Sequence, residues 1–318
     1  MRRHARVAAL GGGTGLAAVL RGLKYHPLDL TAIVTVADDG GSSGRLRREL
    51  GVPPPGDIRN CLVALADDES LLGTLFQHRF NDGDLSGHSF GNLFLAALTE
   101  VTGNFDRAIE ECSRVLKIRG RVLPTTLAPI RLWAEKIGGR AIRGETAISA
   151  TPGACSRVWL EPEHPPAYEP AVEAILNSDL LLLGPGSLFT SVLPHLVIPD
   201  IAAAVAQTGA LRVYVCNVMT QPGETDGMDA VAHLERIRDA VPGGVDVVLV
   251  HDGPIVPSVR DAYFRQGQET VGLDDIDACG VRVVRAPLAA AGSAVRHDPG
   301  RLAEAVLLLA QEAAARPV

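Results

Sequence analysis

Aromatic residues are scarce in this chain of 318 residues, at only 4%, although hydrophobic residues make up 47%. The core must therefore be built from Ala, Val, Leu and Ile. That composition suits parallel strands covered by helices better than a β-sandwich. The length allows one large domain or two small ones.

Cysteine is also sparse, because only five are scattered along the sequence and none are spaced as Cys-x-x-Cys. This pattern argues against a disulfide scaffold or a zinc site and indicates a reducing compartment, so we expect a cytoplasmic protein. The basic N-terminal residues precede a strand and a glycine turn, not the apolar run of a signal peptide. No apolar stretch approaches the roughly 20 residues that span a bilayer, so we expect no membrane insertion.

An excess of basic residues is lacking as well. The chain has 30 Lys and Arg against 37 Asp and Glu, a net charge of −7. Nucleic acid backbones require a basic face, so we expect no nucleic-acid partner. The local basic cluster Arg45-Leu46-Arg47-Arg48 is interpreted as solvated surface.

Short apolar runs alternate with helical patterns along most of the chain. This alternation predicts a Rossmann-like three-layer α/β/α fold with a mostly parallel sheet. A more helical lobe, inserted in the sheet, is expected from about 86 to 158. Strands are expected at 7–10, 31–36, 180–183, 211–215, 245–250 and 281–284, and helices at 16–23, 57–66, 90–101, 105–116, 229–240 and 301–313.

A glycine turn, Gly11-Gly12-Gly13-Thr14-Gly15, joins the first strand to the first helix. It is neither a full dinucleotide fingerprint, since Leu16 replaces the third glycine, nor a Walker A loop. Glycines let the backbone approach an anion, and the N–H groups of the following helix start face it. We predict phosphate binding by Gly12, Gly13, Thr14 and Gly15; the alternative is a tight turn with no ligand.

Two acids and two serines follow the second strand in the run Asp38-Asp39-Gly40-Gly41-Ser42-Ser43-Gly44. The carboxyl end of a parallel strand is where open α/β sheets bind ligands. An acid there can bind a sugar diol or hold a divalent metal beside a phosphate. We predict ligand binding by Asp38, Asp39, Ser42 and Ser43, with Asp38 and Asp39 as candidate ligands of Mg²⁺. The alternative is ordinary turn chemistry.

Two further helix starts carry polar side chains. Asp57 follows three prolines and a glycine and is suited to cap its helix, with Asn60 on the first turn. His88 and Asn92 lie in Gly87-His88-Ser89-Phe90-Gly91-Asn92. We expect these four residues at the ligand cleft, although a packing or capping role is the alternative for each, and no Ser-His-Asp triad is evident.

Two more polar loops follow buried strands. Gly186 and Ser187 come after the strand at 180–183, and Asn217, Thr220, Gln221, Glu224 and Thr225 come after the strand at 211–215. The alternative for both loops is a polar connection with no ligand. In a parallel sheet, these loops and the two earlier ones converge on one crevice.

The assembled motifs closely resemble the YvcK-type gluconeogenesis factor family within the CofD-like superfamily. The resemblance covers nearly the whole chain as one CofD-like domain over residues 1–318, and the Asp-Asp-Gly-Gly-Ser-Ser-Gly block is its most specific part. The matching blocks are 11–16, 38–47, 54–60, 87–93, 184–188 and 222–225.

This resemblance implies a cytoplasmic protein that binds UDP-sugars, notably UDP-N-acetylglucosamine. It also implies regulation that links growth on gluconeogenic carbon to cell-wall synthesis and cell shape, with cell-wall synthesis proteins as candidate partners. The segment Arg296-His297-Asp298-Pro299 resembles the family's C-terminal basic segment, which implies that Arg296 binds the UDP-sugar. The sequence leaves the oligomeric state open, a homo-oligomer included.

Two enzymatic alternatives stay open. Enzymatic relatives in the superfamily are magnesium-dependent 2-phospho-L-lactate transferases, which share the glycine turn and the aspartates. Their Pro-Lys-Leu stretch after the first glycines is replaced here by Leu16-Ala17-Ala18-Val19. An NAD-dependent enzyme is disfavoured by the missing third glycine and the lack of a hydride-transfer site.

Overall fold

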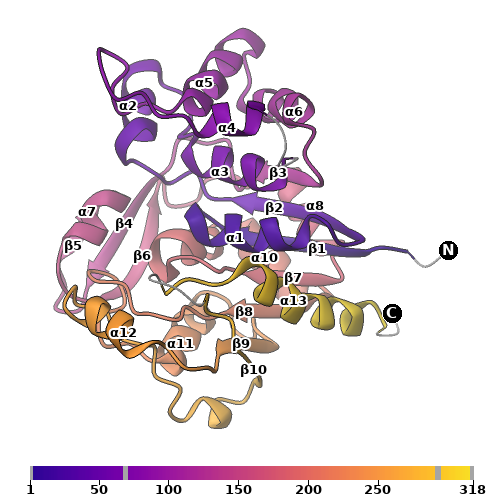
Figure 1. The fold of residues 1–318 in the computed structure, drawn as a ribbon, viewed down its shortest axis with the longest axis vertical. Coiled ribbons are helices and arrows are strands. Elements are labelled where there is room, and N and C mark those ends of the chain that lie inside the picture. The colour runs from indigo at the N-terminus through magenta and orange to yellow at the C-terminus, as the bar shows by residue number, and fades with distance from the viewer. Residues whose placement is uncertain (1–2, 67–70, 291–294, 316–318) are drawn as a thin grey trace.

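The computed structural model describes residues 3–66, 71–290 and 295–315, and it is organised around one parallel sheet (Figure 1). The sheet has seven strands in the order β10-β9-β8-β7-β1-β2-β3. This arrangement confirms the predicted α/β class. The strands are β1 (Ala5–Gly11), β2 (Leu28–Val34), β3 (Arg121–Pro124), β7 (Leu180–Leu183), β8 (Leu211–Val215), β9 (Val247–His251) and β10 (Arg282–Ala286).

Strand β1 lies where the strand order reverses. It pairs with β2 on one side and with β7 on the other, so Ala9 is opposite both Ala32 and Leu182. The chain leaves β1 toward β2 and later returns to the other side of β1. In open α/β sheets the crevice at such a reversal, outside the carboxyl ends of the strands, is the usual ligand site.

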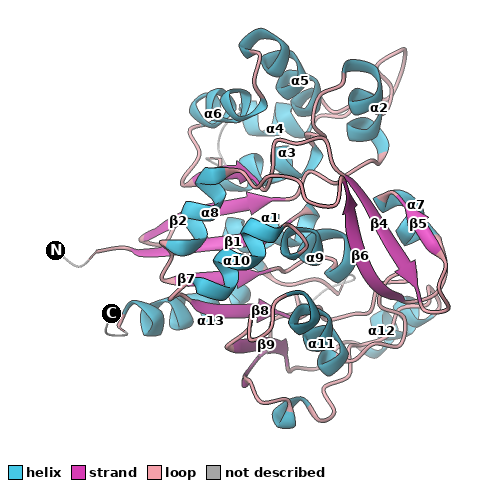
Figure 2. Cartoon of the chain, turned by 180° about the vertical axis from the view of Figure 1, so that it is seen from behind, coloured by secondary structure: helices cyan, strands magenta, loops and turns pink. Residues whose placement is uncertain are grey.

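Helices cover both faces of the sheet, as the two opposite views show (Figures 1 and 2). One face carries α1 (Gly13–Leu23), which packs against α3 (Gly56–Leu65) and α13 (Pro299–Ala314). The other carries α8 (Glu169–Leu176), α9 (Leu193–Leu196), α10 (Pro199–Gln207) and α11 (Ala230–Ala240). Because both faces are covered, the central strands are mostly apolar rather than alternating, whereas the edge strand β10 carries Arg282 and Arg285. The carboxyl-terminal residues of the central strands β1, β7 and β8 are all buried.

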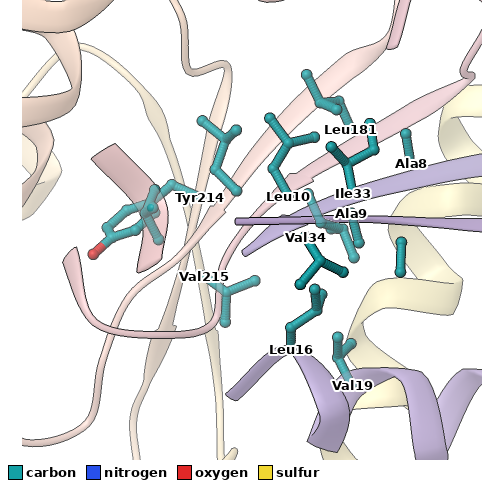
Figure 3. Close-up of a cluster of buried hydrophobic side chains, with 14 of the residues drawn as sticks. Ala8, Ala9, Leu10, Leu16, Val19, Ile33, Val34, Leu181, Tyr214 and Val215 are labelled. Atoms are coloured by element: carbon teal, nitrogen blue, oxygen red, sulfur yellow. The ribbon is translucent and has the colours of Figure 1, made fainter. Parts of the chain in front are cut away.

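The core is aliphatic, as the composition predicts (Figure 3). Leu10, Ile33, Val34 and Leu181 are all fully buried. The largest buried side chain, Tyr214, shares a 2.8 Å hydrogen bond with Nδ1 of His233, so its hydroxyl is satisfied inside the core.

The inserted lobe differs from our expectation in its limits. The helical part begins earlier than residue 86 and comprises α2 (Gly41–Leu50), α4 (Leu71–Gln77), α5 (Phe90–Thr102) and α6 (Phe105–Leu116), which gather beyond the β3 edge (Figure 1). The later part is mainly strand. β3 joins the main sheet, while β4 (Arg131–Lys136), β5 (Ala141–Arg143) and β6 (Cys155–Glu161) form a separate antiparallel sheet beside α7 (Glu145–Ala150).

No single helix in the described residues is long and apolar enough to cross a membrane. The stretches Leu188–Leu196 and Pro199–Gln207 pass that test only as a pair, and they are bent by 81° relative to each other.

We predict that Leu182→Ala lowers the free energy of unfolding by about 3 kcal/mol, because it leaves a cavity in a fully buried central strand. Equilibrium urea unfolding followed by circular dichroism measures this. Leu308→Ala is the control, since Leu308 is 69% exposed on α13. Equal losses in the two variants would contradict the assignment of β7 to the core.

Candidate functional site

A cleft of about 810 Å³ opens at the carboxyl ends of the central strands. It is formed by the turns after β1 and β7, the loop after β8 and the segment that leads into α13, with contributions from α7 and from α12 (Pro257–Phe264). Eleven of the predicted residues line it: Gly12, Gly13, Thr14, Gly15, Gly186, Ser187, Asn217, Thr220, Gln221, Glu224 and Arg296. Three of the four loops predicted to converge, those after β1, β7 and β8, therefore meet at this cleft, whereas the loop after β2 does not line it.

The glycine turn after β1 is packed too closely for side chains. A Cβ on Gly15 would lie 2.6 Å from the carbonyl oxygen of Pro185, and one on Gly12 would lie 2.6 Å from Oδ2 of Asp57. Helix α1 then begins at Gly13 with no side-chain cap. The N–H of Gly13 donates to the carboxylate of Asp57, so the remaining N–H groups of the first turn and the positive end of the helix dipole are what favour an anion at this point of the cleft.

The turn after β7 is tied to the loop after β8 by a buried carboxylate. Ser187 caps the helical stretch Leu188–Val192 by accepting from the N–H of Thr190 at 3.3 Å, and its hydroxyl donates to Oε2 of Glu224. The other oxygen of Glu224 accepts from the hydroxyl of Ser149 on α7 at 2.7 Å. Burial raises the pKa of Glu224, and the hydroxyl donors oppose that rise. Glu224 thus holds three elements around one wall of the cleft.

The loop after β8 is shaped by its own side chains. Asn217 donates to the side-chain oxygen of Gln221 at 3.2 Å, and the hydroxyl of Thr220 accepts from the N–H of Glu269 at 2.8 Å. Thr225 is fully buried and its hydroxyl accepts from the N–H of Gln221 at 2.8 Å. Thr225 does not line the cleft, so the structure gives it a loop-shaping role.

Two arginines supply positive charge to the cleft. Arg21 on α1 and Arg296 before α13 both line it and both are exposed. Neither forms an ion pair within the described parts of the chain. Together with the N-terminus of α1, they make this cleft suited to a diphosphate.

A group of carboxyls lies behind the glycine turn. The carboxylate of Asp57 accepts from the N–H of Gly13, and burial together with the negative charge of Asp38 raises the pKa of Asp57 to about 7. Asp57 does not cap its helix as predicted, because the N-cap is Pro55. Burial also raises the pKa of Asp38, although Asp38 accepts from the N–H of Gly40 at 2.8 Å.

Glu145 completes this group from the cleft side. Its Oε2 is buried without a hydrogen-bond partner, and its pKa is raised by burial and then by Asp57 and Asp38. Asp57 and Asp38 therefore raise the pKa of Glu145, and Asp38 raises that of Asp57, so bringing a cation or a proton to this group relieves the repulsion.

The other predicted residues lie outside the 810 Å³ cleft. Ser42 shares a 2.9 Å hydrogen bond with Nδ1 of His88, and Asn92 donates to the hydroxyl of Ser43 at 3.5 Å. Burial, followed by the charge of Arg45, lowers the pKa of His88. Ser42, Ser43, His88 and Asn92 thus join α2 to α5, and Asn60 accepts from its neighbour Arg59 at 2.6 Å.

Asp38 and Asp39, the candidate magnesium ligands, have different partners. Asp38 faces Gly40 and Ser43, whereas Asp39 accepts from both the N–H (2.9 Å) and the hydroxyl (2.8 Å) of Thr146. Within the described ranges, no group of three or more His, Cys, Asp or Glu side chains is placed to hold a metal ion.

Several cleft residues were not predicted. Arg21, Glu145 and Ser149 come from helices, and no short motif marks them. His297 lies beside Arg296, and burial lowers its pKa to about 4. Tyr263, Gln266 and Gln268 come from the end of α12 and the connection after it, and no turn directly after a strand marks them.

Comparison with known proteins agrees with this architecture. The profile of the family described as 2-phospho-L-lactate transferase CofD matches residues 7–289. The gluconeogenesis factor of Bacillus subtilis is 45% identical over 98% of this chain and 100% of its own length. The gluconeogenesis factor of Halalkalibacterium halodurans is 49% identical over 95% of each chain. A crystal structure of a UPF0052 family member from Bacillus halodurans superposes with a TM-score of 0.92 at 48% identity, covering 96% of this chain and 99% of that one.

We predict that Asp57→Asn makes stability less dependent on pH. The folded pKa of about 7 lies above the ordinary value of 3.8, so the folded state binds the proton more tightly. The contribution of Asp57 to stability therefore falls as the pH rises from 4 toward 7 and is constant above 7.

Between pH 5 and pH 8, the titration of Asp57 should lower the free energy of unfolding of the wild-type protein by on the order of 2–3 kcal/mol. The Asp57→Asn protein should lack this decrease. Urea unfolding at the two pH values measures it. The control is Asp84→Asn, in an exposed loop. An Asp57→Asn protein with the wild-type pH dependence would show that Asp57 is ionised normally in the folded chain.

Proposed function

The chain belongs to the CofD family, and we propose that it is a UDP-sugar-binding regulatory protein with UDP-N-acetylglucosamine as its ligand. The carrying observation is that the uncapped N-terminus of α1, Arg21 and Arg296 face one cleft at the reversal of strand order. We further propose a cytoplasmic role that links gluconeogenic carbon metabolism to cell-wall synthesis and cell shape, as the family resemblance implies.

The cleft has the chemistry that such a ligand needs. A diphosphate would accept hydrogen bonds from the first turn of α1 and from the two guanidinium groups, which are strong donors to phosphate. The amide groups of Asn217 and Gln221 and the hydroxyl of Thr14 line the cleft and would make sugar or base contacts on this proposal. The volume of about 810 Å³ lies in the range of small-molecule sites.

Binding without turnover is favoured by the way the polar side chains are held. The hydroxyl of Ser187 donates to Glu224, and that of Thr220 is bonded to the backbone at residue 269. These groups build the walls of the cleft instead of pairing a free nucleophile with a base. On this proposal the signal passes to a partner protein, of which cell-wall synthesis proteins are candidates, or through a homo-oligomer.

A magnesium-dependent phospholactyl-type transfer is the second candidate. It is favoured by the buried, unpartnered Oε2 of Glu145, because Asp57 and Asp38 disfavour a negative charge on Glu145 that a divalent cation would neutralise. Carboxylate oxygens are the ligands that Mg²⁺ prefers, and the ion would neutralise phosphate charge near the glycine turn. Incubation with a deazaflavin precursor, activated phospholactate and magnesium tests this candidate, and absence of product rejects it.

We predict that Arg296→Ala weakens binding of UDP-N-acetylglucosamine at least about 10-fold, because a charge-assisted hydrogen bond to phosphate is lost. Isothermal titration calorimetry measures the change. The matched control is Arg260→Ala, which removes an exposed arginine of α12 that does not line the cleft. No binding to the wild-type protein at millimolar ligand, or equal affinities in the two variants, would reject the proposal.

A further inference from the structure

A second cavity, of about 1050 Å³, is lined by α2, the loop that follows it and the small β5-β4-β6 sheet. None of its lining residues lines the UDP-sugar cleft. The two cavities approach each other at α7, since Gly144 lines one and Glu145 lines the other. This second cavity is therefore a separate space.

Positive charge is concentrated in this cavity. Four arginines line it, Arg47, Arg48, Arg131 and Arg143, against two acids. The chain as a whole carries a net charge of −7, so the charge of this cavity is opposite in sign to that of the chain. Arg47 and Arg48 belong to the cluster that we interpreted as solvated surface, and the fold instead brings this cluster beside the arginines of the small sheet.

Both acids of the cavity are already engaged. Asp39 accepts two hydrogen bonds from Thr146. Glu161 forms an ion pair with Arg143 at 3.1 Å and accepts from Nε1 of Trp133 at 2.9 Å. The hydrogen bond from Trp133 and the nearby arginines lower the pKa of Glu161. The Glu161 carboxylate therefore stays ionised and paired with Arg143.

Three of the arginines form no ion pair within the described ranges: Arg47, Arg48 and Arg131. Arg47 donates to the carbonyl oxygen of Ile130. Burial and the like charge of Arg131 lower the pKa of Arg47, while Asp39 and Asp38 oppose that change. An anion bound among these arginines would relieve the repulsion between Arg47 and Arg131.

The rest of the cavity wall is apolar. Val36, Val52, Pro54, Leu127 and Ile130 are among its lining residues. A ligand that complements both parts of the cavity has an apolar body and an anionic head. Guanidinium groups bind phosphate through parallel N–H donors, which makes a phosphate the fitting head group.

We propose that this arginine-lined cavity is a second ligand site, which binds a small phosphate ester with an apolar body. Its lining residues are distinct from those of the UDP-sugar cleft, so a variant in one site leaves the direct ligand contacts of the other in place. A ligand bound there would contact Arg131 and Arg143 on one side and Arg47 on the other.

Phenyl phosphate is the probe, with phenol and inorganic phosphate as its two halves. Binding can be followed by tryptophan fluorescence, because the chain has only two tryptophans and both lie on the small sheet. Trp133 and Trp159 are stacked at 5.9 Å, and Trp133 is bonded to Glu161 at the cavity wall. A phosphate that draws Arg143 away from Glu161 would change the surroundings of Trp133.

We predict saturable binding of phenyl phosphate that is tighter than that of either half. Arg131→Glu should weaken it at least 10-fold, because it reverses an exposed charge at the cavity. Arg140→Glu makes the same change at an exposed position of the β4–β5 connection outside the cavity and should leave the affinity within 2-fold. Arg296→Ala should likewise leave it unchanged, which separates this site from the UDP-sugar cleft.

Thermal unfolding of each variant checks that the fold is retained. The proposal is overturned if phenyl phosphate fails to bind at tens of millimolar. It is also overturned if phenyl phosphate binds no better than inorganic phosphate, or if Arg131→Glu binds as the wild type does. Loss of binding in Arg296→Ala but not in Arg131→Glu would assign the probe to the UDP-sugar cleft instead.

Discussion

The close approach of two strand-to-helix turns, after β1 and after β7, is the constraint on which the rest of the site depends. A Cβ on Gly15 would overlap the backbone of Pro185 and Gly186, so the contact requires glycine. A buried histidine fixes the same turn, because Nε2 of His195 donates to the carbonyl oxygen of Gly11 at 3.0 Å and Nδ1 accepts from Thr125 at 2.9 Å. Burial lowers the pKa of His195 to about 4, so the imidazole stays neutral and keeps both bonds.

This contact organises charge on both sides of the glycine turn. In front of it, the N-terminus of α1 and the arginines at 21 and 296 favour an anion. Behind it, burial and the charge of Asp38 raise the pKa of Asp57, and burial and the charge of Asp39 raise the pKa of Asp38. Asp57 also accepts from the N–H of Gly13, so it orients the turn at an electrostatic cost. Such perturbed groups gather at functional sites more often than elsewhere.

Much of the fold and part of the cleft could be predicted from the sequence, because short-range rules govern them. The buried strands and the polar turns after them follow from apolar runs and glycines, and the turns after β1, β7 and β8 meet as parallel pairing requires.

Other features could not be predicted from the sequence. The small antiparallel sheet was missed because its strands alternate in burial and are interrupted by α7. The places of Asp57, His88 and Asn92 depend on how α3 and α5 pack, which local sequence does not encode. The same holds for the arginine-lined cavity, which brings Arg47 and Arg48 together with Arg131 and Arg143 from about 80 residues further along the chain.

A co-crystal structure with UDP-N-acetylglucosamine tests the central claim most directly. The account predicts that the diphosphate lies against the first turn of α1, within hydrogen-bonding distance of its N–H groups, with Arg296 on its other side. A diphosphate that instead occupies the arginine-lined cavity, or that lies elsewhere with the glycine turn unliganded, would contradict it.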